Sequence, residues 1–262
     1  MADVIDLLAH GPLSCVHVGG GACTIPRYVS ATRPGSRHIV IEPDGLLVNL
    51  VREQLDLRSV PRLKVIVAGG REGTAKVWDA SADLVVLDAF TAATMPVELA
   101  TAEYMGDIAR ILSSDGTLLI NLADGKGLAF ARRLLATVTS TFRHVALMAE
   151  PGIMRGRRFG NLIVAASRTD LPVDLLTRRA AGGLTQARCV YGEGLTNFVA
   201  GAAVIRDGDP VLAPVPRLPS SARSRVHTTG GPHLGPPASF SCAGTAARPG
   251  EVRCGLPCAW KK

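Results

Sequence analysis

The run VHVGGGACTIP, residues Val16 to Pro26, places three glycines between an apolar stretch and the start of a helical pattern. The residues before the glycines predict a buried strand, and Pro26 suits the first turn of a helix, where a missing N–H costs little. Glycines at such a turn let the backbone approach a ligand closely. The helix N-terminus after them favours an anionic or carboxylate-bearing group. The run therefore predicts a strand, a ligand-binding loop and a helix at the start of an α/β domain; a tight turn without a ligand is the alternative.

The sequence on either side of this run alternates short apolar stretches with longer helix-compatible segments, as parallel β–α–β units do. The expected strands are residues 15–18, 38–41, 63–67, 84–87, 117–121, 145–149 and 161–166. The expected helices are residues 25–31, 46–55, 74–78, 97–112 and 127–141. We expect an α/β fold with a seven-stranded, mostly parallel sheet, a terminal antiparallel pair and helices on both faces.

The last part of the chain has a different composition. Residues 207–262 contain 9 of the 17 prolines and show neither helical nor strand periodicity. This predicts a domain at residues 1–206 followed by a disordered tail. The Arg, Pro, Ser, Gly and Cys bias of the tail is also typical of out-of-frame translation of GC-rich DNA.

Charge and composition argue against two classes of partner. The tail supplies +4 of the net charge of +7, and aromatic residues make up 4% of the chain, so we expect no nucleic-acid partner. No apolar run reaches the roughly 18 residues that span a bilayer, and Asp3 and Asp6 stand where a signal peptide is basic. We expect a soluble, cytoplasmic protein with no membrane partner.

The six cysteines are irregularly spaced, which favours free thiols and no metal site.

Two acidic residues follow predicted strands. Glu42 ends the second strand, 23 residues after Gly19, where a carboxylate can accept both ribose hydroxyls. That spacing also suits NAD enzymes, although Thr24 stands where a dinucleotide fingerprint has its third glycine. Asp88 ends the fourth strand, at the sheet edge where α/β folds bind ligands. Together with the glycines, these acids predict one crevice; a solvated carboxylate at Glu42 and a helix cap at Asp88 are the alternatives.

The chain resembles the spermidine synthase family over roughly residues 13–166. The resemblance lies in the glycine loop, the Glu-x-Asp of the second strand and the Asp at the end of the fourth strand, which follow one another in the same order as in the family. The resemblance implies the Rossmann-like fold of class I methyltransferases, with S-adenosylmethionine or decarboxylated S-adenosylmethionine as co-substrate. It implies that Asp88 is the proton acceptor that helps an amine attack the aminopropyl carbon, and that Glu42 binds the ribose. The implied nucleoside-binding residues are Gly19, Gly20, Gly21, Glu42, Asp44 and Gly69. Further family motif positions coincide with Arg27, Glu72, Pro96, Glu98 and Leu99.

The chain departs from the family at three acidic positions, where it has Ala22, Gly69 and Thr91. By resemblance, the acid at position 22 holds the aminopropyl amine, and the acid at position 69 lies near the adenine. A charge pair at about 4 Å contributes about 4 kcal/mol at an effective dielectric near 20, before desolvation is subtracted. The departures therefore predict weakened amine binding. The family's N-terminal β-rich domain also has almost no room before Leu13.

Three hypotheses about function stay open. The leading one is a spermidine-synthase-like transferase whose small-molecule partner is a polyamine or another nucleophile. Assembly of the chain into a homo-oligomer is compatible with this hypothesis. The second is S-adenosylmethionine-dependent methyl transfer, which tolerates the loss of amine-binding acids. The third is a non-catalytic nucleoside-binding or interaction protein. His17, His38 and Cys23 are interpreted as structural residues.

Overall fold

The computed structural model describes residues 1–8, 10–183 and 186–216. The chain separates into a unit from Met1 to Leu218 and a second unit from Pro219 to Lys262, and no residue of the second unit is described. The predictions of disorder and of out-of-frame translation for residues 217–262 thus lie outside the described residues.

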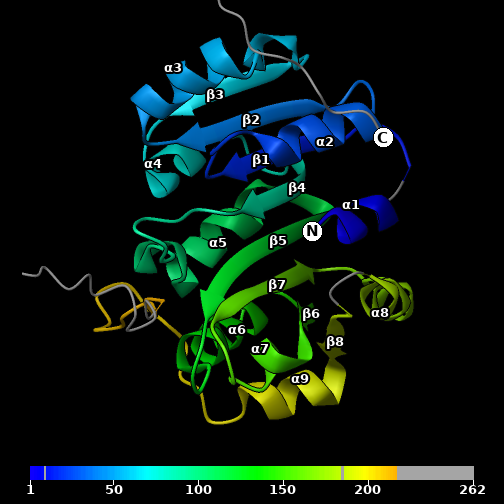
Figure 1. The fold of residues 1–262 in the computed structure, drawn as a ribbon, viewed down its shortest axis with the longest axis vertical. Helices are drawn as coiled ribbons and strands as arrows, with labels where there is room; N and C mark the ends of the chain where they lie inside the picture. Colours follow the sequence, from blue (N-terminus) through cyan, green and yellow to red (C-terminus); the bar gives the residue numbers. More distant parts are fainter. Residues whose placement is uncertain (9, 184–185, 217–262) are drawn as a thin grey trace, which may run out of the picture. The chain divides into compact units, whose positions relative to one another are not determined.

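A single sheet runs through the first unit (Figure 1). Its strands are β1 Ser14–Val18, β2 Arg37–Glu42, β3 Leu63–Val67, β4 Ala82–Leu87, β5 Leu112–Asp124, β6 His144–Ala149, β7 Gly160–Ser167 and β8 Arg188–Tyr191. Their order is β3-β2-β1-β4-β5-β7-β6-β8. The first five strands pair in parallel, and β7 runs antiparallel to both β5 and β6. The predicted α/β class and the predicted strands are confirmed.

The sheet has eight strands in place of the predicted seven. The additional strand, β8, pairs antiparallel with β6 through residues such as Val190 opposite Leu147. It spans four residues, two of them exposed and two half-buried, so its apolar signal is weaker than that of the interior strands.

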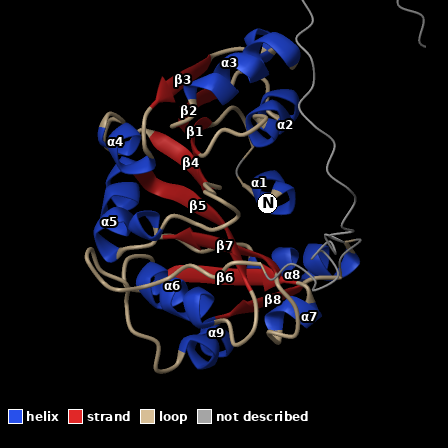
Figure 2. Cartoon of the chain, turned by 60° about the vertical axis from the view of Figure 1, so that its left-hand side comes forward, coloured by secondary structure: helices blue, strands red, loops and turns tan. Residues whose placement is uncertain are grey.

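Helices cover both faces of the sheet (Figure 2). They are α1 Ala2–Leu7, α2 Thr24–Thr32, α3 Gly45–Gln54, α4 Gly70–Ala75, α5 Ala102–Ile111, α6 Ala129–Thr139, α7 Pro151–Met154, α8 Val173–Gly182 and α9 Gly192–Val199, with 3-10 turns η1 Leu57–Ser59 and η2 Val97–Leu99. The predicted helix at residues 97–112 is divided into η2 and α5, because the Thr101 side chain accepts the Tyr104 N–H and caps a new helix. None of the described helices is long and apolar enough to cross a membrane.

Two apolar layers hold the helices against the sheet. On one face, α5, α6 and α9 contribute buried residues such as Ile108 and Leu134. On the other face, α1, α2 and α8 contribute Ile5, Val29 and Leu176, which pack against alternate residues of the same strands. Burial on both faces explains why the interior strands are almost continuously apolar.

The first residues of the predicted tail contact the α/β unit. Asp207 forms an ion pair with Arg71 at 2.6 Å, and Asp209 forms one with Arg133 at 3.0 Å. Val211 packs against the larger apolar layer. These contacts attach the described part of the segment after residue 206 to the domain, and a domain boundary at residue 206 stays a prediction.

Candidate functional site

The glycine loop after β1 fits closely between the ends of β2 and β4. Gly19 has φ +95°, and a Cβ built there would lie 2.2 Å from the carbonyl oxygen of Asp88. A Cβ at Gly20 would lie 3.0 Å from a methyl group of Val40 and 3.3 Å from Oε2 of Glu42. Gly21 has open space around it but φ +46°, so its backbone conformation is the one that favours glycine. Steric contact therefore explains why glycine stands at positions 19 and 20, and backbone geometry explains it at position 21.

Glu42 lies at the end of β2 and faces this loop. Its Oε2 accepts the backbone N–H of Gly20 at 2.8 Å and that of Gly21 at 3.3 Å, while its Oε1 accepts the N–H of Asp44 at 3.1 Å. The side chain is 9% exposed. The structure therefore brings the predicted acid and the predicted loop into direct contact.

Asp44, another predicted ligand-binding residue, serves as the N-cap of α3. Its Oδ1 accepts the N–H groups of Leu46 and Leu47 at 2.9 and 3.0 Å. This capping satisfies two of the helix's free N–H groups and keeps the turn after Glu42 in place.

Asp88 follows β4 and is half-buried. Its backbone N–H donates to the Val18 carbonyl at 2.9 Å, and its Oδ1 accepts Nδ2–H of Asn121 on β5 at 2.8 Å. The amide oxygen of Asn121 is buried and has no hydrogen-bond partner among the described residues. Sequence reasoning missed Asn121, although its position on the strand after Asp88 could have placed it at the same sheet edge.

A cavity of about 130 Å³ joins Asp88 to the glycine loop. It is lined by His17, Gly19, Gly20, Gly21, Ala22, Thr24, Ile25, Pro26, Val86 and Asp88. Asp88 is the only acid in this lining, and no lysine or arginine belongs to it. A larger cavity of about 430 Å³ lies at the opposite edge of the strands, where Arg62, Lys64 and Trp78 line it, and contains none of the predicted site residues.

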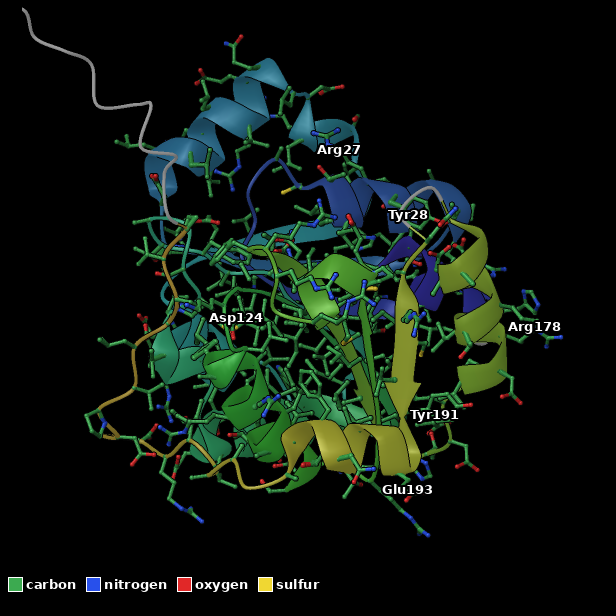
Figure 3. All side chains as sticks on the ribbon, turned by 60° about the horizontal axis from the view of Figure 1, so that its bottom comes forward. Arg27, Tyr28, Asp124, Arg178, Tyr191 and Glu193 are labelled. Atoms are coloured by element: carbon green, nitrogen blue, oxygen red, sulfur yellow. The ribbon has the colours of Figure 1, made fainter. Side chains whose placement is uncertain are left out.

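Gly69 and Arg27 lie outside the cavity. Gly69 precedes α4 as its N-cap, and a Cβ there would meet no atom within 4 Å, so packing alone would allow an acidic side chain. Arg27, labelled in Figure 3, donates a hydrogen bond to the carbonyl of Leu55 and so links α2 to the end of α3.

The segment after Asp88 contains a tight turn. Thr91 and Thr94 exchange two backbone hydrogen bonds of 2.8 and 3.0 Å, and Oγ1 of Thr94 donates to the Thr91 carbonyl at 2.8 Å. Thr91 is exposed, so the position carries neither a charge nor a buried contact.

A second buried acid, Asp124, ends β5 in the packed interior (Figure 3). It accepts N–H groups of Gly125 at 2.6 Å and Ala131 at 2.8 Å, at the start of α6. Burial raises the pKa of Asp124, which these backbone hydrogen bonds partly oppose. Its contacts indicate a structural role in anchoring the loop before α6.

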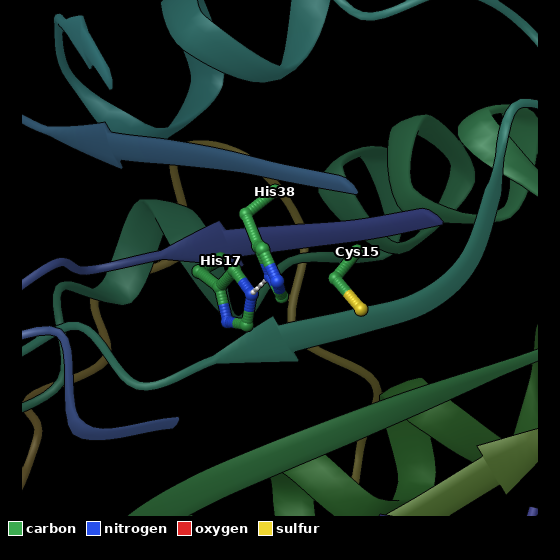
Figure 4. A group of neighbouring side chains, drawn as sticks. All are labelled: Cys15, His17 and His38. Carbon is green, nitrogen blue, oxygen red and sulfur yellow. Dashed lines mark hydrogen bonds between the residues drawn. The ribbon is translucent and has the colours of Figure 1, made fainter. Parts of the chain in front are cut away.

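Cys15, His17 and His38 form the one group of three potential metal ligands found among the described residues (Figure 4). Their ligand atoms lie within 4.8 Å of one another, but His17 Nε2 and His38 Nδ1 share a hydrogen bond at 3.2 Å. Burial raises the pKa of the Cys15 thiol to about 12, which opposes the thiolate that a metal ion requires. The absence of a metal from this protein stays a prediction.

Comparison with known proteins gives matches among solved structures. No family model and no curated protein matches the chain. A probable spermidine synthase from Corynebacterium glutamicum is 32% identical, with 83% of this chain and 79% of that chain covered and a TM-score of 0.72.

Two more distant structures share the fold. Spermidine synthase from Thermotoga maritima is 20% identical over 74% of this chain and 66% of that chain, with a TM-score of 0.53. Human methyltransferase-like protein 13 in complex with SAH is 18% identical over 80% of this chain and 93% of that chain, with a TM-score of 0.54.

Proposed function

The chain belongs to the spermidine synthase family, and from this premise we propose that it is a transferase whose donor substrate is S-adenosylmethionine or decarboxylated S-adenosylmethionine. The observation that carries the proposal is the Glu42 carboxylate, held by the amides of the glycine loop beside the cavity that Asp88 lines. Glu42, the glycine loop and Asp88 each have a separate task in the proposed reaction.

Glu42 is the proposed ribose-binding residue. The three backbone N–H groups that it accepts fix both carboxylate oxygens in place. A carboxylate offers about four lone-pair positions, so one position stays open, on Oε1, to accept a hydroxyl proton. A second ribose hydroxyl can bind Oε2 when it replaces the longer contact, that of the Gly21 N–H at 3.3 Å.

The glycine loop is proposed to hold the part of the donor next to the ribose. Gly19 and Gly20 let the loop pack against Asp88, Val40 and Glu42, and Gly21 has open space around it, so a ligand can approach the backbone at Gly21. Ala22 and Thr24 line the adjoining cavity without adding charge.

Asp88 is the proposed proton acceptor. S-adenosyl donors supply a positively charged sulphur from which an alkyl group leaves. When an amine attacks that group, a nitrogen–carbon bond forms, the carbon–sulphur bond breaks and the amine must lose a proton. Asn121 fixes Oδ1 of Asp88 at the sheet edge, so the carboxylate is oriented to accept that proton.

The products of the full chain test this proposal. We expect incubation with decarboxylated S-adenosylmethionine and a polyamine to give methylthioadenosine and a longer polyamine, both detected by mass spectrometry. If neither S-adenosylmethionine nor decarboxylated S-adenosylmethionine transfers a group to a polyamine, the assignment as a spermidine-synthase-like transferase is contradicted.

Methyl transfer is a second candidate because Ala22, Gly69 and Thr91 replace the three family acids. Methyl transfer requires positioning of a nucleophile and has no need to bind a diamine through several carboxylates. S-adenosylhomocysteine formed from S-adenosylmethionine in the same assay would identify it.

A further inference from the structure

His17 is a buried polar residue in the wall of the cavity that also contains Asp88. It is the last residue but one of β1, with 2% of its surface exposed. Its Nε2 faces His38, and Figure 4 shows the other ring nitrogen turned away from His38. That nitrogen, Nδ1, has no hydrogen-bond partner among the described residues. Native proteins rarely leave a buried polar atom unpaired unless a ligand or water completes it.

A hydrogen-bonded chain fixes the ring of His17. His38 Nδ1 lies 3.2 Å from His17 Nε2, and His38 Nε2 lies 3.0 Å from the hydroxyl oxygen of Ser30 on α2. Each hydrogen bond uses one proton. When Ser30 donates to His38, His38 donates to His17 and Nδ1 of His17 carries a proton. When His38 donates to Ser30, His17 donates to His38 and Nδ1 of His17 is a bare acceptor.

Both histidines are neutral near pH 7. Burial, with a smaller contribution from His38, lowers the pKa of His17 to about 3. Burial also lowers the pKa of His38. His17 therefore brings an unpartnered ring nitrogen to the lining of the cavity without adding a positive charge there.

The remaining lining defines the class of ligand. Asp88 contributes the only charged side chain, and Ile25, Pro26 and Val86 contribute apolar surface. A negative charge favours a cation, and an acceptor nitrogen requires an N–H or O–H donor. An ammonium group on an aliphatic chain meets both requirements.

We propose that Nδ1 of His17 accepts a hydrogen bond from the amino group on the aliphatic chain of the donor substrate. The inference rests on the proposed function and deepens it. It assigns to the lining of the cavity, in addition to Asp88, a residue that selects the donor by its amino group. His17 is thereby a substrate-binding residue, and His38 is the residue that positions it.

Two substitutions separate this role from a structural one. In His17→Asn, the amide places a polar atom near the position of Nδ1 and loses the contact with His38. In His17→Gln, the longer amide places a polar atom near Nε2, so it keeps a partner for His38 and loses the cavity contact. S-adenosylmethionine and decarboxylated S-adenosylmethionine carry the amino group, whereas methylthioadenosine does not.

Calorimetric titration of the full chain with these three ligands tests the proposal. We expect His17→Gln to weaken binding of both amino-bearing ligands by roughly tenfold or more, the usual effect of losing a hydrogen bond to a charged group. His17→Asn should bind them more tightly than His17→Gln does. Methylthioadenosine should bind all folded variants equally, which also shows that the loop is intact.

Three outcomes would overturn the proposal. Equal losses for all three ligands in both variants would make His17 a structural residue while leaving the proposed function standing. No binding of any ligand to the unmodified chain would remove both the proposed function and this inference. Stoichiometric zinc in the purified protein, lost in both variants, would assign the ring nitrogens to a metal site.

Discussion

Oε2 of Glu42 accepts the backbone N–H of Gly20 at 2.8 Å, which joins the end of β2 to the glycine loop after β1. The same oxygen accepts the N–H of Gly21, so the acid and the loop form one rigid unit. Asp88 and the cavity that it lines with the glycines lie beside this unit.

Gly19→Ala tests the steric fit of the loop. The added methyl group would lie 2.2 Å from the Asp88 carbonyl at a φ of +95°, so the loop must shift. We expect a loss of about 1–3 kcal/mol in the free energy of unfolding in urea, with loss of nucleoside binding. Gly106→Ala, within α5 and with open space around it, is the matched control and should stabilise the chain by about 0.5–1 kcal/mol. Equal stability of the two variants would contradict the described loop.

Asp88→Asn tests proton acceptance. The amide keeps the size of the side chain but cannot take a proton from an attacking amine. We expect the rate of transfer at saturating donor to fall by roughly 10²–10⁴-fold. The measurement is the initial rate of methylthioadenosine formation at saturating donor. Asp115→Asn, at an exposed position, is the control, and an unchanged rate in Asp88→Asn would rule out this role.

His17 makes stability depend on pH. Its pKa is lowered to about 3 in the folded chain from 6.5, so below pH 6.5 the unfolded chain binds a proton that the folded chain does not. The contribution of His17 to the free energy of unfolding is therefore complete above pH 6.5 and is lost as the pH falls toward 3. Each pH unit within this window costs about 1.4 kcal/mol at full slope.

Urea unfolding at pH 7, 6 and 5 measures this dependence. The unmodified chain should lose more stability between pH 7 and 5 than His17→Asn does. Parallel stability profiles for the two chains would show that His17 is not held neutral by burial.

The segment after residue 206 should stabilise the domain. Arg133 donates to the carbonyls of Ala203 and Val204 as well as to Asp209, and Val211 packs against the apolar layer. We expect a chain ending at residue 216 to be more stable than one ending at residue 206 by about 1–2 kcal/mol, because it keeps the ion pairs and the half-buried Val211. Equal urea midpoints would favour a boundary after residue 206.

Much of this fold could be predicted from the sequence because interior strands buried on both faces are almost continuously apolar. All seven predicted strands were found. The helix α1 was missed, although Ile5 is fully buried, because six residues carry too little periodicity to identify a helix. The division at Thr101 was also missed, since a threonine within an apolar pattern reads equally well as a helical residue.

The candidate site could be predicted in part. The glycine loop, Glu42 and Asp88 each follow a strand, so topology alone brings them to one sheet edge. The pairing of His17 with His38 depends on strand register, which places Cys15 opposite His38 and His17 two residues further along β1. The interpretation of both histidines as purely structural therefore missed the unpartnered nitrogen that faces away from the pair.

Calorimetric titration of Glu42→Gln tests the central claim most directly. Glu53→Gln, an exposed position on α3, is the matched control. We predict that methylthioadenosine and at least one S-adenosyl donor bind the unmodified chain and the control alike. Glu42→Gln should weaken the binding of both ligands at least tenfold, because an amide with one oxygen cannot accept the three backbone N–H groups and a ribose hydroxyl proton as well. Unchanged affinity in Glu42→Gln, or no binding to the unmodified chain, would contradict a nucleoside site at this loop.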